Sequence, residues 1–381
     1  MGALAGSPDP AKASDTSGSR TGNAQKNATL VDQTKRHTAW KLAGMLADRH
    51  FAAILDRHLS SGEHRADLIP LLSDYAVVSA EAMSAANTLR SEDQKLRASK
   101  GIDTQIDSLL EIRLFVPKGY VGRWNWSDLM VAYTPAGKSK RWTTIEAFDR
   151  TGMSHYLDAR TPPSTPVLVA GINRRKDLRA GVAVMNKHLQ AQGLQLAAAP
   201  ASPVASLVTA EASIETTRLD RITLVNDQEP WISGAAEIYA VVSGIQPDQA
   251  QAALTVVDMP YLDDDATTYT PNQIVIFWSS YRFAAANLQL FEHDDNTDYQ
   301  QLALALSQGV TSILGAFAPN ITVIGQVATA ILQAMPASTF TNDDDYVDSF
   351  YTLEKNRVYT NYVGVAQNAT VSLTPYLLKG Q

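Results

Sequence analysis

Charge is distributed very unevenly along this chain of 381 residues, and this restricts how the chain can fold. From Asp220 to the C-terminus there are 18 Asp and Glu against 5 Lys and Arg, whereas the rest of the chain has 21 against 27, from totals of 39 and 32. Carboxylates that collect in neighbouring loops repel one another and destabilise the folded state unless cations neutralise them. The sequence therefore predicts that the folded C-terminal half has compensating cations.

The composition allows a packed interior but excludes several chemistries. Hydrophobic residues make up 45% of the chain and charged residues 19%, which is typical of a globular protein and not of a disordered or coiled-coil chain. The chain has no cysteine, so disulfides, zinc–thiolate sites, iron–sulfur clusters and thiol nucleophiles are excluded. The basic run at 174–179 is short and lacks interleaved aromatic residues, so nucleic-acid binding is not expected.

Four segments differ in pattern. Residues 1–36 are polar and lack an apolar cluster, which predicts a disordered tail. Residues 37–195 begin with apolar residues at helical spacing and continue with short β-branched and aromatic runs, which predicts a helical segment plus a β-rich domain. Residues 196–217 have the Ala- and Pro-rich composition of a linker, and residues 218–381 contain further short runs typical of an antiparallel β-sandwich. The expected fold class is α+β.

The segment 299–342 contains no Asp, Glu, Lys, Arg or His and is rich in apolar residues, with a break at Pro319-Asn320. This pattern predicts a helical hairpin inserted into the sandwich. Neither arm reaches the roughly 20 apolar residues that cross a bilayer, so no transmembrane span is expected. A hairpin that covers a sheet is favoured, and insertion into a membrane is the alternative.

Acidic residues of the C-terminal half gather at the ends of the predicted strands, most densely at 263–265, 292–298 and 343–348. Such loops suit Ca²⁺, which takes six to eight oxygen ligands in tolerant geometry. Zinc and copper are disfavoured because these segments offer His293 as their one nitrogen ligand and no thiolate. We therefore expect Ca²⁺ as a cofactor, the alternative being a solvated acidic surface without a bound ion.

Two of these segments resemble the calcium loops of C2 domains. Residues 227–242, with acids before a Tyr-containing strand, resemble the first loop, and residues 288–298, with alternate acids at a strand end, resemble the third. The resemblance implies a C2-like β-sandwich that binds calcium, although the insertion at 299–342 departs from that fold. The ligands that it implies are Asp227, Glu237, Asp263, Asp265, Glu292, Asp294 and Asp298. Residues 220–378 also resemble an uncharacterised family of secreted bacterial proteins, a domain of unknown function.

Outside the acidic loops, two groups of residues are candidates for binding or catalysis. Trp124 and Trp126 alternate in a segment expected to be extended, so both rings would lie on one face and could stack on a sugar or lie at a lipid surface. The alternative is a packed face of the β-rich domain. Glu146, Asp149 and Asp158 are candidates for an acid–base pair. No motif identifies a catalytic residue, since Gly-x-Ser-x-Gly and His-Glu-x-x-His are both absent.

These features predict a secreted or periplasmic calcium-binding protein whose C2-like domain binds an anionic lipid or a polysaccharide at a cell surface. Ala3-Leu4-Ala5 before Gly6 resembles a signal-peptidase site. The alternative is a secreted hydrolase with its catalytic groups in residues 37–195, in which the C2-like domain is a calcium-stabilised targeting module. A cleft that holds Glu146, Asp149 or Asp158 beside Trp124 and Trp126 would favour the enzyme.

Overall fold

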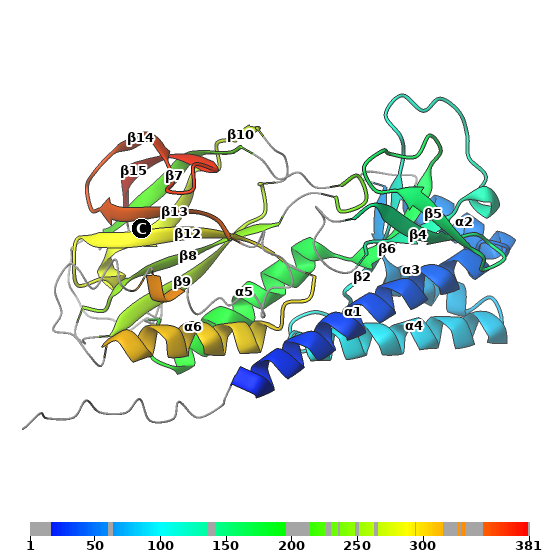
Figure 1. Cartoon of the computed structure of the whole chain (residues 1–381), viewed down its shortest axis with the longest axis horizontal. Helices are drawn as coiled ribbons and strands as arrows, with labels where there is room; N and C mark the ends of the chain where they lie inside the picture. Colours follow the sequence, from blue (N-terminus) through cyan, green and yellow to red (C-terminus); the bar gives the residue numbers. More distant parts are fainter. Residues whose placement is uncertain are drawn as a thin grey trace, which may run out of the picture.

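The computed structural model describes residues 17–59, 64–135, 142–195, 213–225, 230–234, 237–247, 251–262, 266–293, 295–314, 327, 329–331 and 346–379. Two β-containing parts lie side by side along the long axis of the molecule, and helices run beneath both of them (Figure 1). Helices and antiparallel sheets are both present, so the prediction of a mixed α+β fold is confirmed.

The N-terminal part is a six-stranded sheet covered by helices. The strand order is β1-β2-β6-β3-β4-β5, and every neighbouring pair is antiparallel except β3 and β6, which are parallel. The strands are β1 (Arg65–Asp67), β2 (Leu110–Phe115), β3 (Val131–Tyr133), β4 (Thr144–Phe148), β5 (Ser154–Asp158) and β6 (Val167–Ile172). The helices are α1 (Ser17–Met45), α2 (Arg49–Leu59), α3 (Leu68–Ala76) and α4 (Ala80–Ser99).

Helix α1 corrects the prediction of a disordered tail for residues 17–36, whereas residues 1–16 of that tail lie outside the described residues. The helix begins at Ser17, and among its described side chains Val31 is fully buried and continues a stripe that leads to Leu42. Lys35 lies in the same stripe and is only 2% exposed. A charged residue in the buried stripe hides the helical periodicity of apolar residues, so the sequence pattern did not indicate this part of the helix.

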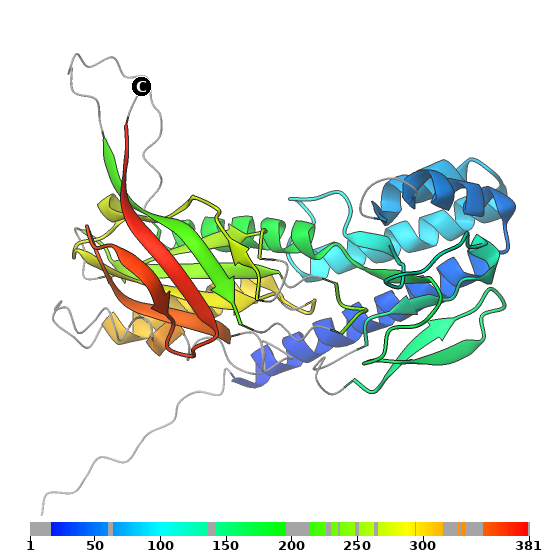
Figure 2. The ribbon, with the colours of Figure 1, turned by 90° about the horizontal axis from the view of Figure 1, so that it is seen from above.

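The C-terminal part contains two antiparallel sheets that share one hydrophobic core, with Leu219, Val242 and Phe350 fully buried within it. The first sheet has the order β10-β7-β15-β14, with β11 also paired to β7, and the second has the order β13-β12-β8-β9. The strands of the first are β7 (Ile214–Leu224), β10 (Thr268–Tyr269), β11 (Gln273–Phe277), β14 (Tyr359–Val363) and β15 (Ala369–Leu378). The strands of the second are β8 (Ile238–Ile245), β9 (Ala252–Met259), β12 (Ala285–Glu292) and β13 (Tyr346–Glu354). Seen from above, β7 and β15 form a long ladder at one side of this part (Figure 2).

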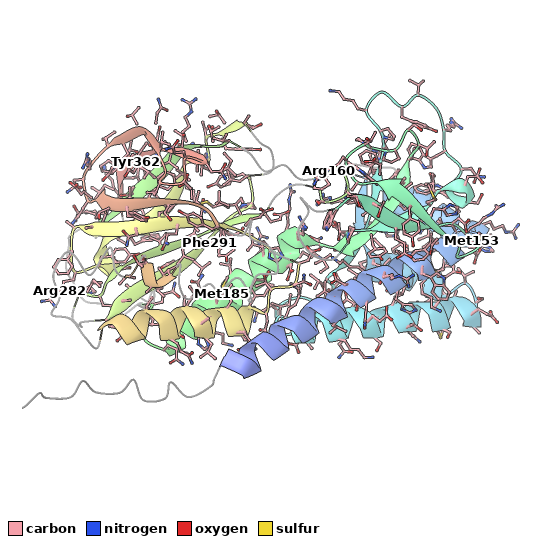
Figure 3. All side chains as sticks on the ribbon, in the orientation of Figure 1. Met153, Arg160, Met185, Arg282, Phe291 and Tyr362 are labelled. Atoms are coloured by element: carbon pink, nitrogen blue, oxygen red, sulfur yellow. The ribbon has the colours of Figure 1, made fainter. Side chains whose placement is uncertain are left out.

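Helix α5 (Arg174–Ala191) directly follows β6 of the first sheet and packs against β9 and α6 (Tyr299–Leu314). Its Asn186 side chain bonds both the N–H and the carbonyl of Val256, at 2.9 and 2.8 Å. Met185 of α5 is fully buried, and Figure 3 labels it below the second sheet. Although the sequence assigned α5 to the domain at 37–195, the helix connects the two parts of the molecule.

The two remaining predicted segments are described in part. The first arm of the predicted hairpin at 299–342 is helix α6, whereas most of the second arm lies outside the described residues. Residues 196–212 of the predicted linker also lie outside them, and residues 214–217 belong to β7. The likeness to a C2 domain stays a prediction.

Candidate functional site

Two of the acidic segments predicted to bind calcium lie next to each other. Ile238 at the start of β8 pairs with Glu292 at the end of β12, and the N–H of His293 donates to the carbonyl of Glu237 at 2.8 Å. Within the described part of the chain, no three His, Asp or Glu residues are placed to hold a metal ion. Four of the proposed ligands, Asp227, Asp263, Asp265 and Asp294, lie outside the described residues. Calcium binding therefore stays a prediction.

The described members of that set have contacts within the protein. The Glu237 side chain is 4% exposed, with Oε1 3.8 Å from Nε of Arg175. Asp298 Oδ1 accepts the backbone N–H groups of Gln300 and Gln301 at 3.1 Å, so Asp298 caps the first turn of α6. A carboxylate that already has such partners is stabilised less by a bound cation than a carboxylate without partners is.

The N-terminal half supplies cations to the acidic half. Nζ of Lys35 lies 3.1 Å from Oδ2 of Asp295, and Nε of Arg174 lies 2.8 Å from Oδ1 of the same residue. Burial alone would raise the pKa of Asp295, but Arg174 and Lys35 outweigh it and hold this pKa well below its usual range. Lys100 and Asp177, both fully buried, form a further pair at 2.9 Å within the N-terminal half, and Nζ of Lys100 also donates to the carbonyl of Thr297 in the acidic half at 3.1 Å. Part of the compensating charge that the sequence requires therefore comes from the chain itself.

The tryptophan pair differs from its predicted geometry. Trp126 begins the short 3-10 helix η1 (Trp126–Asp128), so the segment is not a strand. The rings of Trp124 and Trp126 meet edge to face at an interplanar angle of 84°. Trp126 is 8% exposed, and its Nε1 donates to Oδ1 of Asp56 at 3.3 Å. These observations favour the packing alternative for Trp126 over a shared binding face.

The three candidate carboxylates accept hydrogen bonds within the protein. Glu146 accepts two 2.8 Å bonds from Arg36, which lowers the pKa of Glu146. Asp149 accepts from Thr151 and pairs with His155 at 2.7 Å, and Asp158 accepts backbone N–H groups of the following turn. Hydrogen bonds lower the pKa values of Asp149 and Asp158 too. A carboxyl that acts as general acid needs a raised pKa, so none of the three is suited to that role.

A cavity of about 370 Å³ lies between helix α1 and the β4–β5 hairpin. Four of the residues that line it belong to α1. Positions 36, 37 and 40 follow position 33 by three, four and seven residues, so the four side chains lie on one face of the helix. The lining residues are Gln33, Arg36, His37 and Trp40 of α1 together with Phe148, Gly152 and Ser154 of the hairpin. Trp40 is 43% exposed. Gly152 has φ +81°, and a Cβ there would lie 2.9 Å from Nε1 of Trp40, so this position requires glycine.

The polar side chains of this cavity are held in place. Arg36 is fixed by Glu146 and lies over the Phe148 ring at 5.2 Å. His37 stacks on Trp40 at 5.8 Å, and its Nδ1 lies 2.5 Å from Oε1 of Glu92 on α4. Sequence reasoning missed this site because it placed residues 1–36, including Gln33 and Arg36, in a tail and interpreted the apolar residues from 37 on only as a helical pattern. The signal that indicates it is the helical spacing of Gln33, Arg36, His37 and Trp40.

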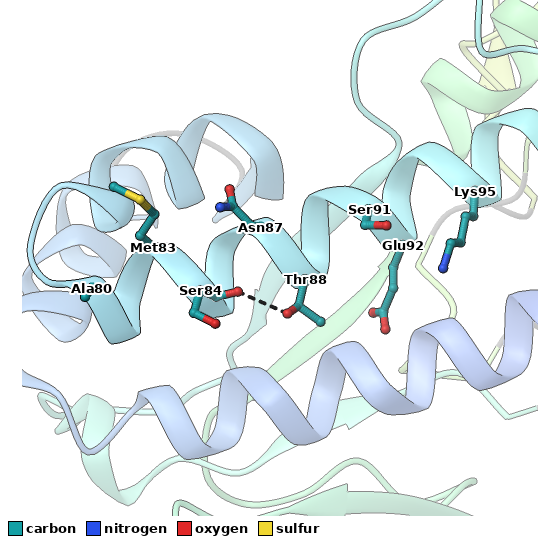
Figure 4. A pocket seen from close by; sticks show the side chains of 8 residues that line it. All are labelled: Ala80, Met83, Ser84, Asn87, Thr88, Ser91, Glu92 and Lys95. Atoms are coloured by element: carbon teal, nitrogen blue, oxygen red, sulfur yellow. Dashed lines mark hydrogen bonds between the residues drawn. The ribbon is translucent and has the colours of Figure 1, made fainter.

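A second, more open groove of about 660 Å³ runs along α4 and is hydroxyl-rich. Figure 4 shows its side chains on the α4 surface, with α1 lying alongside. Its lining residues are Ala80, Met83, Ser84, Asn87, Thr88, Ser91, Glu92 and Lys95. Since Glu92 lines the groove and bonds to His37 of the cavity, the two hollows adjoin.

The fold and site define an α+β protein with a polar and aromatic cavity beside its N-terminal sheet, and no helix of the described residues is long and apolar enough to cross a membrane. A family model described as "Protein of unknown function (DUF3103)" matches residues 35–381, and the chain belongs to this family. No match was found among curated proteins or among solved structures.

Proposed function

We propose that this protein binds a neutral glycan in the cavity beside α1. The observation that carries the proposal is the half-exposed indole of Trp40 among fixed polar side chains. An aromatic face packs against the apolar face of a sugar ring, while nearby donors and acceptors bond its hydroxyls. The volume of about 370 Å³ lies within the usual range for small-molecule sites.

The charges of the cavity favour a neutral ligand over an anionic one. Arg36, the one full cation among the described lining residues, already has a carboxylate partner in Glu146. His37 likewise faces Glu92. Among these lining residues an anionic lipid or polysaccharide would therefore find no cation without a counter-charge, and Lys41, whose Nζ lies over the Trp40 ring at 5.2 Å, is not one of them. Sugar hydroxyls can share Arg36 and His37 as hydrogen-bond partners.

Calorimetric titration with neutral oligosaccharides of glucose, xylose, mannose and N-acetylglucosamine tests the proposal. We expect at least one of them to bind, and Trp40→Ala to weaken that binding by about tenfold or more, or about 1.4 kcal/mol. Met153→Ala is the matched control, because Met153 is exposed at the end of the same hairpin (Figure 3) without lining the cavity. The absence of binding by any of these sugars, or unchanged affinity in Trp40→Ala, would overturn the proposal.

The same titrations in millimolar calcium and in chelator separate this proposal from the calcium-bridged binding predicted from the sequence. Binding in the cavity should be the same in both, because its contacts are made by Trp40 and neighbouring polar groups. Binding that requires calcium would instead assign the ligand to the acidic loops of the C-terminal half.

A further inference from the structure

The His37 imidazole has the surroundings of a general base. Its Nδ1 lies 2.5 Å from Oε1 of Glu92, and both side chains are partly sheltered, with exposed fractions of 35% and 21%. A carboxylate that accepts the Nδ1–H leaves the lone pair on Nε2, which has no partner among the residues that the structure describes. Because His37 lines the cavity, this nitrogen is available to a bound molecule.

Two further groups of the cavity decide what such a base could act on. Arg36 is held through Nε and Nη2 by Glu146, which offsets its charge but leaves the Nη1 N–H groups to donate hydrogen bonds to a developing oxyanion. The hydroxyl of Ser154 donates to Oε1 of Glu146 at 3.0 Å and is therefore engaged. Water, and not this serine, is the nucleophile that the arrangement favours.

We propose that the cavity hydrolyses ester-linked acyl groups on its bound glycan, with His37 as the catalytic base and Glu92 as its positioning residue. This inference rests on the proposed glycan binding. His37 Nε2 takes a proton from water as the water oxygen bonds to the ester carbonyl carbon, and Arg36 stabilises the resulting oxyanion. The bond from that carbon to the sugar oxygen then breaks, and the imidazolium returns its proton to the departing oxygen. The products are a carboxylic acid and a free sugar hydroxyl.

Cleavage of the glycosidic bond itself fits the cavity less well. That reaction needs a pair of carboxyl groups, one of them protonated to act on the leaving group. Glu146 and Asp149 both have pKa values below their usual range because of their hydrogen bonds to Arg36 and to Thr151 and His155. An imidazole base with a nearby guanidinium suits ester hydrolysis instead.

Acetate release from O-acetylated oligosaccharides of whichever sugar binds, with 4-nitrophenyl acetate as a second substrate, tests the inference on the full chain. We expect His37→Asn to lower kcat by about a hundredfold or more, and imidazole in solution to restore part of the activity of His37→Ala. Glu92→Gln should lower kcat by about tenfold with KM unchanged, which distinguishes a positioning residue from one that holds the fold.

The matched control is His155→Asn, since His155 also pairs with a carboxylate but does not line the cavity. Its activity should equal that of the unchanged protein. Calorimetry with the deacetylated sugar shows that each variant is folded and still binds. A protein that binds the sugar but releases no acetate, or a fully active His37→Asn, overturns this inference and leaves the proposed function standing. Failure to bind any sugar overturns both.

Discussion

Glu111 is a carboxyl group whose burial should make stability depend on pH. It lies in β2 with 8% exposure, and its Oε2 has no hydrogen-bond partner within the described part of the chain. Burial raises the pKa of Glu111 to about 7, although Arg65 and Arg113 act against the shift. The folded state thus holds this proton more tightly than the unfolded state, in which the pKa is close to 4.5. The contribution to stability is complete below pH 4.5 and is lost as the pH rises through 7.

We predict that Glu111→Gln removes this loss of stability with rising pH. Between pH 4.5 and pH 8 the free energy of unfolding of the unchanged protein should fall, relative to that of the variant, by up to about 3 kcal/mol. Urea unfolding at several pH values measures the difference. Glu215→Gln, at an exposed glutamate, serves as control. If the curves of Glu111→Gln and the unchanged protein run parallel, the carboxyl is ionised in the fold and the prediction is wrong.

At the scale of secondary-structure elements, Asp348 of β13 fastens the turn between β14 and β15. Its fully buried carboxylate accepts backbone N–H groups of Ser349, Ala366, Asn368 and Ala369 at 2.7–2.9 Å. Each such bond to a charged acceptor contributes about 1.5–3 kcal/mol. This acid belongs to one of the groups from which the sequence predicted calcium, and the backbone of its own chain supplies the positive partners.

Asp348→Asn should therefore lower the free energy of unfolding by at least about 3 kcal/mol, because an amide NH₂ replaces an acceptor and faces donors. Hydrogen exchange of the Ala366 and Ala369 amides locates the effect in the turn. Asp220→Asn in β7, which removes a partly exposed partner of Arg218, is expected to cost about 1 kcal/mol or less. Equal effects of the two substitutions would contradict this role for Asp348.

At the scale of the whole molecule, buried ion pairs join the two parts of the chain. Nζ of Lys100, at the end of α4, contacts Asp177 of α5 at 2.9 Å and the carbonyl of Thr297 at 3.1 Å. His293 Nε2 lies 2.9 Å from the same oxygen of Asp177. Removal of one member of a buried pair leaves an uncompensated charge, and this costs about 3–5 kcal/mol.

Lys100→Met should destabilise the protein by about that amount, and Lys100→Met with Asp177→Asn should be more stable than the single variant. Urea unfolding followed by circular dichroism measures both, and added salt should change the result little, since the pair is buried. Lys355→Met removes a partly exposed partner of the exposed Glu215 and should cost less than about 1 kcal/mol. If Lys100→Met is as stable as Lys355→Met, the buried pair does not hold the two parts together.

The sequence by itself determined the α+β class and the short strands, because these depend on the local spacing of apolar residues. It also determined that the acidic half needs cations. Only the tertiary structure decided where they come from, since Lys35 and Asp295 are 260 positions apart. It also decided that α1 begins at Ser17. The candidate cavity also depends on tertiary packing, because His37 and Glu92 face each other only where α1 packs against α4. No local sequence pattern encodes that contact.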